Sequence, residues 1–334
     1  MDVFSKYYVD VKSLWINKLD LIETDINNYS DNIRYDFYYY LGIMEILLSY
    51  VNDMDIKSEE LVLSHKKRYN NSIDYYNPFN FCIDLKYRDL IANEFRNCVE
   101  GTIQRISSGE LTYRPFHSAL LSDDVIFWSR FERSFSTSFG QRVIEEIAKI
   151  VALSNGATKA ERQKVTVIDI DEEYENVIRN HIQGLRENTE KVKSCDKILH
   201  KLRTTQVSGK IKTIRVISDL WWKDKEGIDN YISLKTVKPN IDQTMVAKED
   251  CLHLSISNPT CNAYFGLPYN PFGEDKTSYA FKPPMGIFDF HQDPVVLIGK
   301  EMWDTIGGDG CYEELLDIAS TIGKETKSKI EKLK

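Results

Sequence analysis

The segment that decides the fold is KIKTIRVISDLWWKDKEGIDNYISLKTVKPNIDQTMVAKEDCLHLSI, residues 210–256. Residues 210–222 and 230–237 are rich in β-branched and aromatic side chains, and a charged, glycine-containing stretch separates them, which predicts two strands joined by a turn. Apolar residues then recur at helical spacing, and Asn240 with Gln243 forms a capping-box pattern. The segment therefore predicts a β-hairpin followed directly by a helix.

The geometry of this hairpin brings three polar residues together. If the turn is centred near Glu226, Asp219 lies opposite Ser233 and diagonal to Lys235. Directly opposed Cβ atoms are ~5 Å apart on one face of a hairpin. Ser233 and Lys235 are two positions apart on one strand, so they share that face. We therefore expect Asp219, Ser233 and Lys235 to converge.

The helix after the hairpin carries an acid among its apolar residues. On a helical wheel measured from Ile241, Leu252 falls near ~20° and Glu249 near ~80°, on the apolar side. A carboxylate there costs free energy unless it pairs, becomes protonated or binds a cation. Asp219 and Lys235 are the nearest candidate partners, and two carboxylates around one point favour Mg²⁺, which prefers oxygen ligands.

Each of these residues also has an ordinary structural explanation. Asp219 could be a strand-end residue, Lys235 a salt-bridge partner, and Glu249 a boundary residue on a helix whose facing is misjudged. Their occurrence together in one short segment favours shared chemistry.

The combination resembles the PD-(D/E)xK nuclease core in its version with a relocated glutamate. Asp219 matches the first acid, Ser233-Leu234-Lys235 matches the (D/E)xK triplet with serine in place of its acid, and Glu249 matches the metal-binding glutamate of the next helix. Two departures are the absence of a proline before Asp219 and the missing acid at Ser233. The second departure leaves the metal site dependent on Glu249.

This resemblance implies a fold of the α/β (α+β) class, with a restriction-endonuclease-like core whose mixed central sheet is flanked by helices. It implies that Asp219 and Glu249 hold Mg²⁺ and that Lys235 orients the attacking water or stabilises charge on the phosphate. Ser233 is then an onlooker or a hydrogen-bond donor to a metal ligand.

The helix before the sheet often contributes a further glutamate near the metals in this superfamily. Glu145 matches that place and is a candidate metal ligand, although helical spacing does not favour it over Glu146.

A narrower resemblance covers most of the chain after about residue 125. The segments FERSFSTSFGQRVIEEIAK, SLKTVKPNIDQ, AYFGLPYNPFG and VLIGKEMWDTIGGDGCYEELLDI are similar to segments of the TdeIII/MjaII-type restriction endonucleases. This resemblance implies a type II restriction endonuclease that cuts double-stranded DNA at a short, GGNCC-like palindrome. It also implies a homodimer and a cognate DNA methyltransferase in the same system.

Two other functions remain open from the sequence. A non-catalytic DNA-binding or interaction protein with a degenerate nuclease fold would explain the missing acid at Ser233. A nuclease of repair or phage defence would use the same metal site.

Outside the hairpin, composition predicts a helical N-terminal region at residues 1–112, for dimerisation or DNA clamping, and a nuclease core at residues 113–334. A helical basic insertion is expected at about 160–210, with its helix running from Glu172 to Leu202. Another helix is expected to begin at residues 136–138. It should end near Leu153.

Charge is distributed unevenly along the chain. The net charge is −8, yet residues 191–215 contain eight basic side chains and one acid. Such a segment either binds an anion or forms a solvated helix surface. The candidates for DNA contact are Lys210, Lys212, Arg215 and Lys238. Arg114, Arg130 and Arg133 are further candidates for reading bases.

The remaining composition argues against several classes of protein. The six cysteines include no close pair of the kind that binds zinc or acts as a redox dithiol. No segment has the apolar length of a membrane span, and the N-terminus does not resemble a secretion signal. We therefore expect a cytoplasmic protein that does not bind membranes.

Overall fold

The computed structural model describes residues 82–108 and 114–333. These residues belong to one compact unit, Cys82–Lys334. Within the expected N-terminal helical region, α4 (Leu85–Ser108) is a helix as predicted, whereas residues 1–81 and 109–112 lie outside the described residues.

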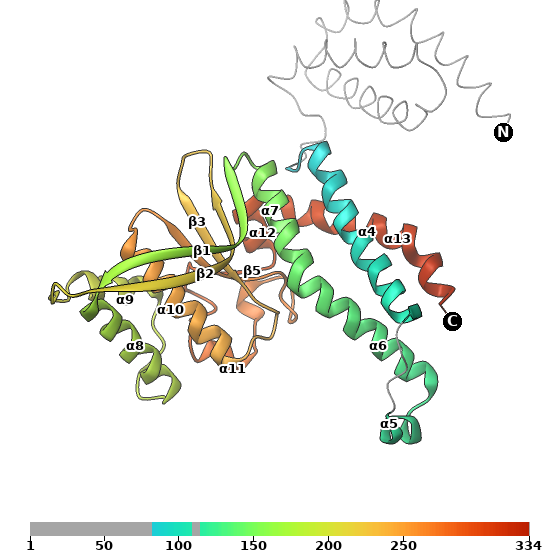
Figure 1. Ribbon diagram of the computed structural model, residues 1–334, viewed down its shortest axis with the longest axis horizontal. Helices are drawn as coiled ribbons and strands as arrows, with labels where there is room; N and C mark the ends of the chain where they lie inside the picture. Colours follow the sequence, from blue (N-terminus) through green and yellow to red (C-terminus); the bar gives the residue numbers. More distant parts are fainter. Residues whose placement is uncertain (1–81, 109–113, 334) are drawn as a thin grey trace, which may run out of the picture. The chain divides into compact units, whose positions relative to one another are not determined.

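The unit is built on a five-stranded mixed sheet with the order β1-β2-β3-β4-β5 (Figure 1). The β1–β2 and β2–β3 pairs are antiparallel, and the β3–β4 and β4–β5 pairs are parallel. The predicted mixed sheet flanked by helices is therefore confirmed. The strands are β1 (Lys159–Asp171), β2 (Ile211–Lys223), β3 (Asp229–Leu234), β4 (Asn262–Leu267) and β5 (Val296–Ile298).

The β2–β3 hairpin has the predicted register. Leu220 pairs with Ile232 and Trp221 with Tyr231, so Asp219 and Ser233 occupy opposed positions one step further along. Gly227 has a φ of +83°, a conformation that glycine adopts without strain, and this closes the turn.

Strand β1 replaces the beginning of the expected helical insertion. Residues 159–171 pair with β2 at every position except Gln163, so the prediction of helix from about residue 160 was wrong. The alternation of β1 buries Ile168 and Ile170 and leaves Val165 and Val167 exposed, which is strand spacing.

The expected helix from Glu172 to Leu202 is divided into two. Helix α8 (Glu172–Arg186) ends before Asn188, whose φ is +55°, and α9 (Cys195–Arg203) begins again after a loop. The Asp293 carboxylate accepts a hydrogen bond from the Cys195 backbone N–H at 2.9 Å, so a distant segment fixes where α9 starts.

The helix before the sheet begins earlier than predicted and ends as predicted. It consists of α6 (Asp123–Ser138), a π-helical turn η1 (Phe139–Val143) and α7 (Ile144–Ser154). Ser122 caps α6, whereas the hydroxyls of Ser136 and Thr137 bond to the preceding turn. These two residues therefore do not cap a new helix.

The helix after the hairpin begins as predicted. Helix α10 (Ile241–Ser257) begins with the Asn240–Gln243 capping box. The tail forms α12 (Lys300–Gly307) and α13 (Cys311–Glu331), separated by a turn in which Gly308 and Gly310 have positive φ. The described residues also form three short helical elements, α5 (Pro115–Leu120), η2 (Lys276–Ser278) and α11 (Lys282–Met285).

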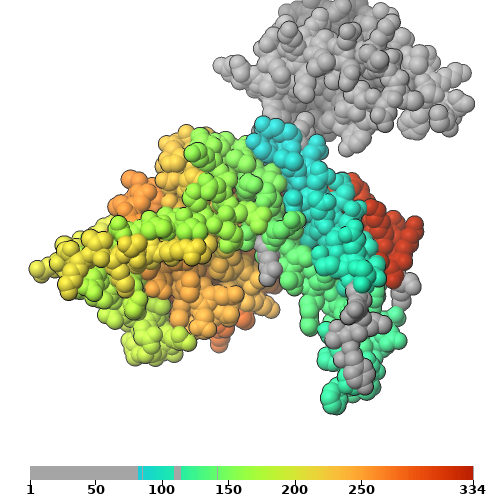
Figure 2. Space-filling view, in the orientation of Figure 1, coloured from blue at the N-terminus to red at the C-terminus, as the bar shows by residue number. Residues whose placement is uncertain are grey.

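Beyond the sheet, most of α6 packs along the end of α4, and α5 packs on α6. Together they form a projection that we call the arm, residues 101–108 and 114–138. Figure 2 shows an open gap between the arm and the surface around α11. No residue of α6 is buried, so the arm contributes little to the core.

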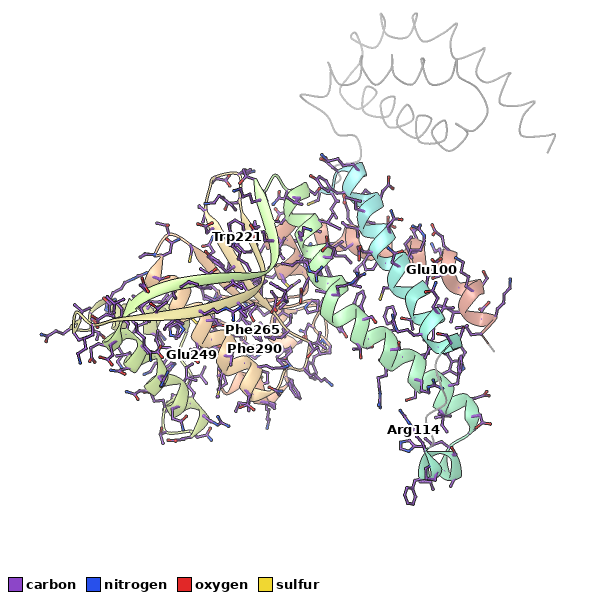
Figure 3. All side chains as sticks on the ribbon, in the orientation of Figure 1. Glu100, Arg114, Trp221, Glu249, Phe265 and Phe290 are labelled. Carbon is purple, nitrogen blue, oxygen red and sulfur yellow. The ribbon has the colours of Figure 1, made fainter. Side chains whose placement is uncertain are left out.

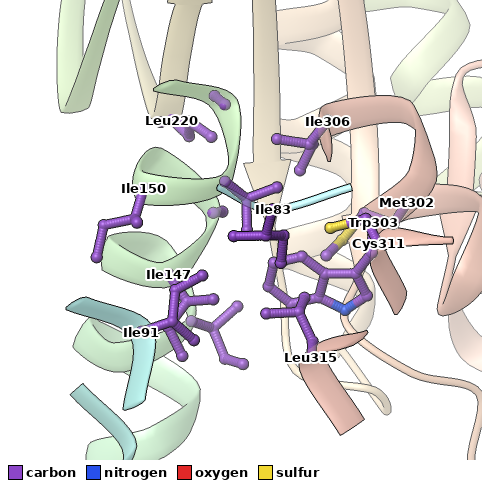
Figure 4. Close-up of a cluster of buried hydrophobic side chains, with 14 of the residues drawn as sticks. Ile83, Ile91, Ile147, Ile150, Leu220, Met302, Trp303, Ile306, Cys311 and Leu315 are labelled. Carbon is purple, nitrogen blue, oxygen red and sulfur yellow. The ribbon is translucent and has the colours of Figure 1, made fainter. Parts of the chain in front are cut away.

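Two apolar layers enclose the sheet. On one face, α8, α9 and α10 pack on an aromatic cluster that includes Phe265 and Phe290, 5.7 Å apart between ring centroids (Figure 3). On the other face, Ile147 of α7 packs with Leu220 of the sheet and Trp303 of α12 (Figure 4). The β2–β3 hairpin thereby lies between two layers of helices.

Candidate active site

The opposed strands of the hairpin bring Asp219, Ser233 and Lys235 together, as the predicted register requires. Lys235 Nζ lies 2.8 Å from Asp219 Oδ2, and Ser233 Oγ donates to the same oxygen at 3.4 Å. The Lys235 and Asp219 side chains are 21% and 17% exposed, so the pair is accessible to a substrate from one side. The Lys235 backbone N–H donates to Gly266 O, which fixes the end of β3 against β4.

Gln163 links Asp219 to the helix before the sheet. Its Nε2 donates to Asp219 Oδ1 at 3.2 Å and to Glu145 Oε1 at 2.9 Å. Gln163 has a φ of +49°, which is strained for a residue other than glycine, and it lies on β1 opposite Asp219. This side chain therefore holds the two carboxylates near each other.

Glu145 and Glu146, which helical spacing did not distinguish, have different surroundings. Glu145 shares Gln163 with Asp219 and also accepts from Arg162 Nε at 3.2 Å. Glu146 instead pairs with Arg162 Nη1 at 2.8 Å and with Lys149 at 3.0 Å. Glu145 is thus the glutamate of α7 that is connected to Asp219.

Asp250 of α10 is a further acid near this group. Burial, followed by the negative charge of Glu249, raises the pKa of Asp250 to about 7; the charge of Asp219 acts in the same direction and that of Lys235 opposes it. A carboxyl group under this repulsion gains from a bound cation. Mg²⁺ prefers carboxylate oxygens as ligands, so the acidic side chains of this group fit a bound Mg²⁺ ion.

Glu249 belongs to a second group of ligand-type side chains. One ligand-type atom from each of Glu175, Glu249 and His253 lies within 4.8 Å of the others. Glu175 already pairs with Lys212 at 3.1 Å and with Arg179 at 2.7 Å. Its charge is therefore balanced by cations of the chain itself. Figure 3 labels Glu249 on α10.

Lys248 fixes the part of α10 that carries both acids. Its side chain is completely buried, and Nζ donates to Lys193 O at 2.8 Å and to Ile287 O at 2.7 Å. Burial lowers the pKa of Lys248. The sequence did not indicate Gln163 or Lys248, and only the adjacency of Asp250 to Glu249 could have pointed to Asp250.

The four predicted DNA-contact residues differ in their surroundings. Lys210 pairs with Glu172 at 3.6 Å and Lys212 pairs with Glu175. Arg215 is exposed on β2, and Lys238 is exposed, with its Nζ 5.5 Å from the centroid of the Phe272 ring. Two of the four are therefore partly neutralised by acids.

Comparison with known proteins identifies the class. The restriction enzyme HgiCII of Herpetosiphon aurantiacus is 30% identical over 279 residues, which cover 79% of this chain and 96% of that enzyme. The type II restriction enzymes HgiEI and HgiBI of the same organism are 27% and 25% identical, over 78% of this chain and 95% of each enzyme. The family described as type II restriction endonuclease, HinfI, matches residues 83–323.

The chain is a site-specific endodeoxyribonuclease of the type II restriction class. More narrowly, it belongs to the HinfI family of type II restriction endonucleases. The alternative of a non-catalytic binding protein is set aside by this membership. Among the residues that the structure describes, no helix is both long and apolar enough to cross a membrane.

Proposed function

We propose that this enzyme hydrolyses phosphodiester bonds of double-stranded DNA with Mg²⁺ at a PD-(D/E)xK site built on the β2–β3 hairpin. The observation that carries the proposal is the contact between Asp219 and Lys235, with Ser233 bonded to the same carboxylate. An acid and a lysine from neighbouring strands at one accessible point are what such a site requires.

The metal ligands in this proposal come from three elements. Asp219 of β2 is the first, and an acid of α10 is the second. The spacing in the sequence favours Glu249 as this second ligand. The negative charges that raise the pKa of Asp250 favour Asp250 instead, because a bound cation would offset them. Glu145 is the third, because Gln163 holds it beside Asp219.

When bound, Mg²⁺ would lower the pKa of a water molecule and neutralise charge on the scissile phosphate. The residues of the chain position the reactants. Lys235 orients the attacking water or stabilises the charge that develops on phosphate oxygens. Ser233 and Gln163 each donate to the Asp219 carboxylate and so restrict its orientation.

The resemblance to the TdeIII/MjaII-type enzymes supports a GGNCC-like palindrome as the recognition site. A palindrome has twofold symmetry, so two copies of the chain, each with one active site, match its two strands. We therefore propose a homodimer that acts in the cytoplasm beside a cognate DNA methyltransferase. Lys210, Lys212, Arg215 and Lys238 are proposed DNA contacts.

The proposed function predicts cleavage that depends on a divalent cation. Purified protein incubated with unmethylated plasmid and MgCl₂ should give discrete bands on a gel, and EDTA should abolish them, because the acids alone supply no activated water. Undiminished cutting in EDTA would refute the metal site. A smear in MgCl₂ would refute site-specific restriction under these conditions.

A further inference from the structure

A cavity on the arm is lined by arginines from three parts of the chain. Its volume is about 450 Å³, and its lining includes Arg105 of α4, Arg114 before α5, and Arg130 and Arg133 of α6. In the labelled side-chain view, Arg114 lies on the arm, away from the sheet (Figure 3). Residues that are separate in the sequence therefore place four guanidinium groups around one space.

Hydroxyl groups, not carboxylates, orient Arg105 in this cavity. Arg105 donates to Ser134 Oγ at 3.0 Å and to Ser138 Oγ at 2.7 Å, which joins α4 to α6. A hydroxyl carries no charge, so these contacts orient the guanidinium without neutralising it. The positive charge of Arg105 remains available to a ligand.

The four arginines lack acidic partners within the part of the chain that the structure describes. Several other arginines there are paired with acids, for example Arg96 with Glu325 at 2.9 Å. The acids of α6 do not line the cavity: Asp123 and Asp124 lie in the first turn, and Glu132 accepts from Ser136. The cavity is thus a concentrated positive site in a chain whose net charge is −8.

Guanidinium groups and hydroxyls are the donors that match phosphate oxygens, and an arginine can bind a phosphate through two parallel hydrogen bonds. Like charges held close together repel one another, and a bound anion relieves that repulsion. The arm also borders the open gap beside the surface around α11 (Figure 2). A duplex lying in that gap would place its backbone next to the arm.

We propose that the arginine cavity of the arm binds backbone phosphates of the DNA duplex, as a contact separate from the active site. The inference rests on DNA being the substrate and not on the assignment of the metal ligands. Such contacts fix the position of the duplex and carry no sequence information. They contribute affinity that falls with salt, because each neutralised phosphate releases counterions.

The test compares the parent with the double variant Arg130→Ala/Arg133→Ala. Affinity for a short duplex is measured in EDTA by fluorescence anisotropy over a series of NaCl concentrations. The plot of log affinity against log salt should become less steep by about 2, roughly one per lost phosphate contact, with about ten-fold weaker binding at low salt. Circular dichroism and thermal unfolding of both proteins verify that the fold is retained.

Two further variants make the test specific. Arg96→Ala removes an arginine of α4 that Glu325 already neutralises, and it should leave the slope unchanged. Arg130→Lys/Arg133→Lys keeps both charges and should retain most of the slope. The proposal is overturned if the alanine variant keeps the parental slope, or if the lysine variant loses as much slope as the alanine variant.

Discussion

Replacing Lys235 with alanine should reduce DNA cleavage by about a thousand-fold while DNA binding stays close to that of the parent. Lys235 Nζ is 2.8 Å from Asp219, and its side chain is 21% exposed. Its loss removes the group that orients the water or stabilises charge on the phosphate. It leaves most of the contacts to the duplex in place.

The measurement is the rate of plasmid nicking in MgCl₂ together with anisotropy of a labelled duplex in EDTA. Lys223→Ala is a matched control, since Lys223 also lies on the hairpin and pairs with an acid, Asp229, at 3.1 Å. That variant should cleave at nearly the parental rate. Cleavage by Lys235→Ala within a few-fold of the parent would show that Lys235 has no role in the reaction.

The two adjacent acids of α10 should differ strongly in their importance. Asp250→Asn should slow cleavage by roughly a hundred-fold or more. It removes a carboxylate whose pKa responds to the charges of Asp219 and Lys235. Glu249→Gln should slow cleavage by less than about ten-fold, because Glu249 lies with Glu175 and His253. Both substitutions preserve shape, and the rates are compared at saturating MgCl₂.

The reverse order of effects would assign the second ligand to Glu249, as the spacing in the sequence indicates. Parental rates in both variants would exclude α10 as a source of ligands. Thermal unfolding of each variant separates a loss of chemistry from a loss of fold, which matters because Glu249 lies beside the buried Glu175–His253 contact.

The sequence predicted the hairpin and the start of α10 because both depend on local rules. The position of the turn fixes the register that opposes Asp219 and Ser233, and the capping box fixes the first turn of the helix. β1 was missed because its exposed Val165 and Val167 lie on the outer face of a long two-stranded ribbon, next to many charged residues.

The facing of α10 could not be predicted, because the wheel assumed a single apolar face. In the structure α10 contacts β1, β2 and β4 as well as α8 and α9, so buried positions occur on several sides of it. Lys248 illustrates the difficulty, since its acceptors are the carbonyls of Lys193 and Ile287 from distant segments. The strained backbone of Gln163 likewise depends on tertiary contacts.

The most direct test of the proposed metal site is anomalous diffraction from crystals of the Lys235→Ala protein soaked with Mn²⁺. Mn²⁺ takes the same oxygen ligands as Mg²⁺ and scatters anomalously. We predict a peak within about 2.5 Å of a carboxylate oxygen of Asp219 and of an acid of α10. A peak confined to the Glu175–Glu249–His253 group, with none at Asp219, would contradict the account.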